Sequence, residues 1–196
     1  MPEPVFVPQF HPAESIEEHI ANRDQEDRNL PAWNWCGICC VRMIALGLKL
    51  DPPSLEDMYE TAFQKHAVFK WVDGQVVGAY HEALATYIRE AFGIEAKAVR
   101  RRSAKDILRL VEDGAWFIAS VSADIRNQTN DAPEKKIGHL VLLFDTYGDD
   151  DTDGFVLHNS AGFSCNGSQA HARVSTTRFA DCFSGCGILI LPTLAR

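Results

Sequence analysis

Three residues that lie far apart in the sequence have side chains that together suit nucleophilic catalysis: Cys36, His139 and Asn159. A cysteine sulfur attacks a carbonyl carbon, an imidazole takes up and returns the proton, and an amide oxygen orients the imidazole. Cys36 stands at the expected first turn of a helix, where unpaired backbone N–H groups and the helix dipole favour the thiolate. We therefore expect Cys36 to be a nucleophile with an activated thiol.

The expected strands bring His139 and Asn159 together. His139 opens an apolar run over 140–144, and Asn159 follows a second apolar run over 155–158. In a hairpin the start of one strand lies beside the end of the next, so we expect the two side chains to be neighbours, with His139 as the general base. His158 points to the opposite face because side chains alternate along a strand, and we expect it to have a surface or packing role.

Helical periodicity and capping residues predict helices in the first half of the chain, and apolar runs or alternation predict strands in the second. The expected helices cover 15–22, 36–46, 54–63, 79–92, 103–112 and 177–182. Apolar residues alternate over 94–99, and the expected strands cover 115–121, 139–147, 155–158 and 187–191. The polar segment 122–137 is expected to be a long loop and a candidate lid. Helices followed by a largely antiparallel sheet indicate the α+β class.

The length of the chain favours one domain. A chain of 196 residues buries a full core without needing disulfides or metal. We expect a single domain over 1–196, with an extended, proline-rich arm over 1–13, a helical half over 14–113 and a sheet half over 115–192. The active-site cleft is expected between the two halves.

The charge balance argues against several partners. The 19 Lys and Arg against 27 Asp and Glu give a net charge of −8, which repels nucleic acid and anionic membrane surfaces. No apolar run approaches the ~20 residues of a membrane-spanning helix, and the first residues lack the features of a signal peptide. We therefore expect a cytoplasmic protein whose six cysteines are reduced.

Several blocks of the sequence resemble, in order, the papain-like cysteine peptidases that remove double-glycine leader peptides from bacteriocins, together with their stand-alone relatives. The matching blocks are Cys36 to Leu46, Trp71 to Ala85, Gly138 to Val141, Val156 to Ala161 and Val174 to Phe179, followed by the closing strand. The resemblance covers roughly positions 30–192 and implies a papain-like fold, in which the nucleophile helix packs on the sheet. It also implies that Cys36 is the nucleophile, His139 the base and Asn159 the residue that orients it.

Two positions differ from the family pattern. The family usually has Asp followed by Pro where this sequence has Asn159 and Ser160. Its oxyanion-hole Gln, six residues before the nucleophile, is matched here by Leu30. Asn34 or Asn29 is then the candidate amide donor, and we favour Asn34 because it is nearer the thiol. The backbone N–H of Cys36 is a further oxyanion donor, and double-glycine specificity is not carried over.

Two patterns of metal-ligand residues are weaker. Cys36 and Cys39 have C-x-x-C spacing, but the second ligand pair of structural zinc modules is missing. The acidic segment 149–154 begins like a calcium loop, yet Ser160 stands where the bidentate Glu belongs, which favours a solvated hairpin turn. Cys39 and Cys40 fit core packing. We expect no metal and no cofactor.

These residues predict a cysteine peptidase or amide hydrolase that acts on a peptide or protein substrate through a thioester acyl-enzyme. The same triad serves an acyltransferase or a deamidase. An inactive papain-like module that binds peptides is an alternative of a different class, favoured by the missing Gln. A redox-sensing or metal-binding protein that uses Cys36 and Cys39 is a third reading.

Overall fold

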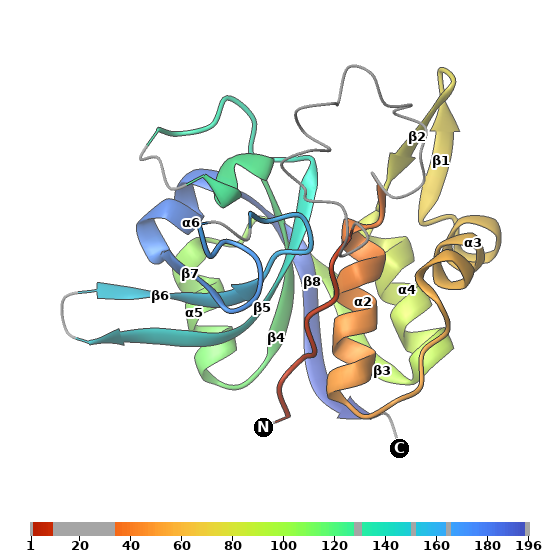
Figure 1. Cartoon of the computed structure of the whole chain (residues 1–196), viewed down its shortest axis with the longest axis horizontal. Helices are drawn as coiled ribbons and strands as arrows, with labels where there is room; N and C mark the ends of the chain where they lie inside the picture. Colours follow the sequence, from red (N-terminus) through yellow and green to blue (C-terminus); the bar gives the residue numbers. More distant parts are fainter. Residues whose placement is uncertain (1, 10–33, 128–130, 150–151, 164–165, 195–196) are drawn as a thin grey trace.

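The computed structural model describes residues 2–9, 34–127, 131–149, 152–163 and 166–194 (Figure 1). The helices are α2 (Cys36–Gly47), α3 (Leu55–His66), α4 (His81–Phe92), α5 (Ala104–Glu112) and α6 (Thr176–Cys182), with a short 3-10 helix, η2 (Ala123–Arg126). The strands are β1 (Phe69–Val72), β2 (Gln75–Gly78), β3 (Ile94–Val99), β4 (Trp116–Val121), β5 (His139–Asp149), β6 (Thr152–His158), β7 (Ala172–Ser175) and β8 (Phe183–Leu194).

Six antiparallel strands form the central sheet, in the order β3-β8-β4-β5-β6-β7. Helices cover both of its faces: α2, α3 and α4 pack on one face, and α5 and α6 pack on the other (Figure 1). Every residue of β4 is buried, including Ser120, which explains why the rest of its sequence is apolar and does not alternate. The expected α+β arrangement, with a nucleophile-bearing helix packed on an antiparallel sheet, is confirmed.

Local capping sets several of the predicted helix boundaries. Ser54 accepts a hydrogen bond from the backbone N–H of Asp57 at 3.1 Å and begins α3. Ser103 and Asp106 form a complete capping box at the start of α5. Gly93 ends α4 in the left-handed conformation that a helix terminus often requires. The helix expected over 15–22 lies outside the described residues.

The segment 14–113, expected to be the helical half, also contains strands, so that expectation was incomplete. β1 and β2 form a separate hairpin, and the two-residue turn Asp73-Gly74 has positive φ at both positions. An Asp-Gly pair between two short segments rich in valine is a strong local signal for this turn, and it was overlooked. β3 pairs with β8 and therefore belongs to the main sheet.

In the second half, the strands are longer than the sequence indicated. β6 begins at Thr152 instead of Phe155, and its antiparallel pairing with β5 confirms the hairpin expected at the acidic segment. β8 spans Phe183–Leu194 because it pairs along one edge with β3 and along the other with β4. β7 was not predicted, and part of the expected 122–137 loop forms η2.

Residues 2–9 form an extended N-terminal arm that runs along α2 (Figure 1). The backbone N–H of Val5 donates to the Met43 carbonyl of that helix at 3.2 Å. Gly47 allows this approach, because a Cβ at that position would lie 2.7 Å from both the Glu3 carbonyl oxygen and Pro4 Cα. The arm is therefore packed against the core and does not trail into solvent.

Among the helices of the described residues, none combines the length and apolar character needed to cross a membrane.

Candidate active site

Cys36 is the first residue of α2, and its side chain is partly exposed while most of the helix behind it is buried. Gly37 keeps this end of the helix close to its neighbours. A Cβ there would lie 3.0 Å from Leu140 Cδ1 and 3.3 Å from the methyl group of Ala79. The start of α2 is thus packed directly against the start of β5, the strand that His139 opens.

Two opposing effects act on the pKa of the Cys36 thiol, which are its burial and the backbone N–H donors around its sulfur. Burial raises the pKa of the Cys36 thiol above its ordinary value, and hydrogen bonds from the backbone N–H groups of Leu140, Gly37 and Cys36 oppose this only in part. The backbone N–H groups at the helix start do favour the thiolate, as expected, but burial acts in the opposite direction. Desolvation outweighs the donors, and the resting side chain is a neutral thiol.

The predicted contact between His139 and Asn159 is confirmed. Nε2 of His139 lies 2.7 Å from Oδ1 of Asn159. The same Oδ1 accepts the backbone N–H of Ala161 at 3.1 Å, which fixes the amide with its oxygen toward the imidazole. Because an amide oxygen only accepts, Nε2 carries the proton, and Nδ1 retains a lone pair that can accept one.

His139 is neutral at neutral pH. Its side chain is 8% exposed, and burial lowers its pKa to about 4, although the Asn159 hydrogen bond acts in the opposite direction. The positive charge of Arg126 lowers the pKa further. The pKa shifts of Cys36 and His139 thus both favour the neutral form of the side chain.

Arg126 is a residue of this site that the sequence did not indicate. It ends η2, donates from Nη1 to the Ala161 carbonyl at 3.2 Å and lies over the Phe163 ring with its guanidinium carbon 5.4 Å from the centroid. The signal for its placement is local: Ser122 caps η2 by accepting the Asp124 N–H at 3.2 Å. Its proximity to His139 depends on tertiary packing, which no local pattern reveals.

The candidate oxyanion donors lie just before and at the start of α2. Asn34 is partly buried, two residues before Cys36, and the backbone N–H of Cys36 opens the helix. Leu30 and Asn29 lie outside the described residues. Of the sequence-predicted donors, Asn34 and the Cys36 N–H belong to the described residues.

Cys39 and Cys40, one turn into α2, are fully buried, and burial raises the pKa of both thiols. This agrees with the expected packing role. Among the described residues, the cluster of possible metal ligands consists instead of Glu3, His158 and His171, whose ligand atoms lie within 4.8 Å of one another.

This cluster fits a structural anchor better than a metal site. His158 is fully buried, and both of its ring nitrogens already have backbone partners. Nε2 donates to the Pro4 carbonyl at 3.0 Å, and Nδ1 accepts the His171 N–H at 3.2 Å. Metal binding by His158 would break one of these hydrogen bonds.

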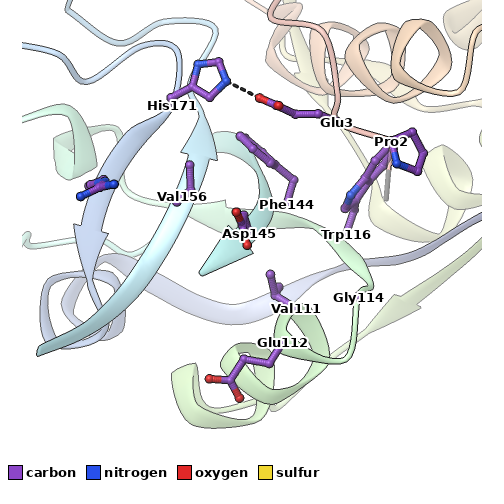
Figure 2. Close-up of a pocket in the computed structure, with 11 residues that line it drawn as sticks. Pro2, Glu3, Val111, Glu112, Gly114, Trp116, Phe144, Asp145, Val156 and His171 are labelled. Atoms are coloured by element: carbon purple, nitrogen blue, oxygen red, sulfur yellow. Dashed lines mark hydrogen bonds and ion pairs between the residues drawn. The ribbon is translucent and has the colours of Figure 1, made fainter. Parts of the chain in front are cut away.

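An open pocket of about 490 Å³ lies beside this cluster, away from the candidate triad (Figure 2). Its lining includes Glu3, Trp116, Phe144, Asp145, His171 and Arg173. None of Cys36, His139 and Asn159 lines it, so this pocket is not the cleft in which the predicted chemistry would occur.

Comparisons with solved structures identify the architecture. The chain is similar to the peptidase domain of Streptococcus ComA, a bifunctional ABC transporter involved in a quorum-sensing pathway, with a TM-score of 0.54 and 14% identity over 86% of this chain and 96% of that one. It is also similar to a putative C39-like peptidase from Bacillus anthracis, with a TM-score of 0.53 and 12% identity over 80% and 88% of the two chains. The chain has the fold of the C39-like peptidases.

This papain-like fold is the one that the sequence resemblance implied. No family model matches the sequence, and a comparison with curated proteins finds no significant relative. The C39-like fold identifies the architecture, whereas the chemistry has to be argued from the side chains of this chain.

Proposed function

We propose that this protein is a cysteine hydrolase that cleaves a peptide or amide bond with Cys36 as nucleophile, His139 as general base and Asn159 as the residue that orients the base. The observation that carries the proposal is the 2.7 Å contact between His139 Nε2 and Asn159 Oδ1, which leaves Nδ1 free to accept a proton. The C39-like fold and the position of Cys36 beside the first residues of β5 support it.

In the acylation step, the Cys36 sulfur attacks the substrate carbonyl carbon while its proton passes to His139 Nδ1. The backbone N–H of Cys36 and the Asn34 amide stabilise the developing oxyanion. When the tetrahedral intermediate collapses, His139 gives the proton to the leaving amine, the C–N bond breaks and a thioester remains on Cys36. Asn159 keeps the ring in the tautomer that this transfer requires.

In the deacylation step, His139 removes a proton from water, which attacks the thioester carbonyl. The carbon–sulfur bond then breaks, the carboxylic acid leaves and the thiol is restored. If another amine replaces water, the same enzyme is an acyltransferase, and if the substrate is a side-chain amide, it is a deamidase. The residues of the triad are the same in all three reactions.

The test combines thiol labelling with cleavage in isotopic water. Brief iodoacetamide treatment at several pH values, followed by mass spectrometry, compares Cys36 with Cys186, which is also a partly exposed free thiol. Because His139 Nδ1 is the proposed acceptor of the thiol proton, we expect labelling of Cys36 to slow in His139→Ala, whereas labelling of Cys186 stays unchanged. Incubation with a peptide library in ¹⁸O-water then reports new carboxyl termini by their mass increase.

The Cys36→Ala and Cys186→Ala variants are the matched controls. Cleavage with ¹⁸O incorporation that disappears only in Cys36→Ala supports the hydrolase. Amide-linked products without ¹⁸O identify an acyltransferase. Labelling of Cys36 that is unaffected by His139→Ala, together with no product, would favour the peptide-binding module instead.

A further inference from the structure

The N-terminal arm is attached at one end to the edge of the sheet. Glu3 points at His171, which stands immediately before β7, and the two side chains form an ion pair or hydrogen bond (Figure 2). The next residue, Pro4, accepts a hydrogen bond from His158 Nε2 at 3.0 Å. The ring of Phe6 packs edge-on against that of His158, with centroids 5.5 Å apart. These contacts fix the path of the arm across the end of β6.

At its other end the arm reaches the turn that carries Asn159. The backbone N–H of Gln9 donates to the Ser160 carbonyl at 2.9 Å, and the Ser160 hydroxyl donates to Gln9 Oε1 at 3.2 Å. Gln9 is 5% exposed and Ser160 is 2% exposed, so water does not compete for these hydrogen bonds. The arm therefore holds the residue that directly follows Asn159 by both its backbone and its side chain.

The same serine also faces the nucleophile helix. The Ser160 hydroxyl lies close enough to the Cys39 thiol, one turn along α2 from Cys36, to offset part of the rise in the pKa of Cys39. Cys39 Sγ in turn lies 3.9 Å from the Pro8 carbonyl of the arm. Ser160 is thus the point at which the arm, α2 and the Asn159 turn meet.

The Asn159 turn depends on such contacts because it follows the last residue of β6. Its other contacts include the Asn159 N–H to the Gln169 carbonyl at 2.9 Å, the Gly162 N–H to the Asn159 carbonyl at 3.1 Å and Arg126 Nη1 to the Ala161 carbonyl at 3.2 Å. On the side of α2, the turn is held through the hydrogen bonds between its Ser160 and Gln9 of the arm. A shift of the turn would move Asn159 Oδ1 away from the imidazole.

We propose that Gln9 and Ser160 are positioning residues of the active site, which set the spacing between the nucleophile helix and the Asn159 turn and so hold Asn159 against His139. This inference rests on the proposed function for its effect on catalysis. Its structural core, the control of the Asn159–His139 hydrogen bond by the arm, can be measured without any substrate.

The experiment uses the full chain and a signal that belongs to this hydrogen bond. The His139 Nε2 proton is buried and bound to Asn159, so its NMR resonance exchanges slowly with water. In Gln9→Met, which keeps the side-chain length and loses the acceptor, we expect at least a tenfold faster exchange of this proton and slower iodoacetamide labelling of Cys36. Ser160→Ala removes the same hydrogen bond from its other partner, and we expect the same two effects. Ser160→Thr retains the hydroxyl, so we expect wild-type values of the exchange rate and of the Cys36 labelling rate.

Val7→Ala is the matched control, because Val7 packs its side chain in the core and is not part of the Gln9–Ser160 pair. It weakens the seating of the arm and lowers the melting temperature without touching the pair. If Gln9→Met and Ser160→Ala accelerate exchange no more than Val7→Ala at an equal loss of stability, the arm is merely structural and the proposal is overturned. Faster exchange with no dependence of Cys36 labelling on His139 in the wild type would retain the positioning role and reject the proposed hydrolase.

Discussion

His158 and Asn159 are adjacent in the chain, yet their side chains hold opposite parts of the molecule. Nε2 of His158 lies 3.0 Å from the Pro4 carbonyl, whereas Oδ1 of Asn159 lies 2.7 Å from Nε2 of His139. The expected alternation at the end of β6 and the packing role of His158 are therefore confirmed. One face of this strand end anchors the arm, and the other orients the candidate base.

Replacing Asn159 should change the protonation of His139 in a charge-dependent way. In Asn159→Asp a carboxylate replaces the amide oxygen, and we expect the pKa of His139 to rise from about 4 to near or above its ordinary value of about 6.5. In Asn159→Ala the buried Nε2–H loses its acceptor, and we expect a loss of about 1–3 kcal/mol in the free energy of unfolding. NMR titration of the ring and urea unfolding measure the two effects. A titration in Asn159→Asp that matches the wild type would contradict the contact.

Removing the charge of Arg126 should raise the pKa of His139, because that charge disfavours the imidazolium. Arg126→Gln keeps a donor for the Ala161 carbonyl and loses the charge. Arg109→Gln is the control, since Arg109 lies in the last turn of α5 and does not affect His139. The histidine ring titration in the two variants is the measurement. Equal titrations would show that the guanidinium is too well screened to matter.

Mild acid should destabilise the fold through two buried histidines. Burial lowers the pKa of both His139 and His158 to about 4, whereas an unfolded histidine titrates near about 6.5. Between these values the unfolded chain binds more protons, so stability is greatest above pH ~6.5 and falls as the pH drops toward ~4. The slope contributed by each histidine is at most about 1.4 kcal/mol per pH unit.

Urea unfolding at a series of pH values tests this, with His158→Gln as the comparison. The variant should lose part of the pH dependence, because one of the two titrating groups is gone. Parallel pH profiles for the variant and the wild type would mean that His158 is protonated equally in the folded and unfolded chains.

Substituting Gly47 tests whether the arm lies against α2. Helix propensity alone predicts that Gly47→Ala stabilises the protein by about 1 kcal/mol. The new Cβ, however, would meet the Glu3 carbonyl oxygen and Pro4 Cα at 2.7 Å, so we expect a net loss of about 1–3 kcal/mol as the arm is displaced. Chemical denaturation measures the difference. A gain in stability would show that the arm is not seated there.

Much of the site could be predicted because its signals are local. The position of Cys36 followed from helical periodicity, and the His139–Asn159 pair followed from the rule that a hairpin brings one strand's start beside the next strand's end. The capping residues Ser54 and Ser103 likewise act within a few residues of their own positions. Each of these inferences needed only residues close in the sequence or the two strands of one hairpin.

The parts that could not be predicted depend on distant packing. Gln9 and Ser160 are separated by 151 residues, and no pattern in either segment indicates that they meet. The thiol of Cys36 shows the same limit: the helix start that favours a thiolate is local, whereas the burial that outweighs it depends on the packing of the whole fold. Local rules could identify the candidate catalytic residues, whereas the protonation states of their side chains depend on tertiary contacts.

Because the arm contacts strands near the other end of the chain, it can take its place only late in the synthesis of the protein. Glu3 precedes its partner His171 by 168 residues, and Pro4 precedes His158 by 154. At a translation rate of about 5–20 residues per second, the arm waits on the order of 10–30 s before the strands that receive it leave the ribosome. If the arm completes the site, a nascent chain that already displays Cys36 still lacks its assembled site, which forms only when the last strands have folded.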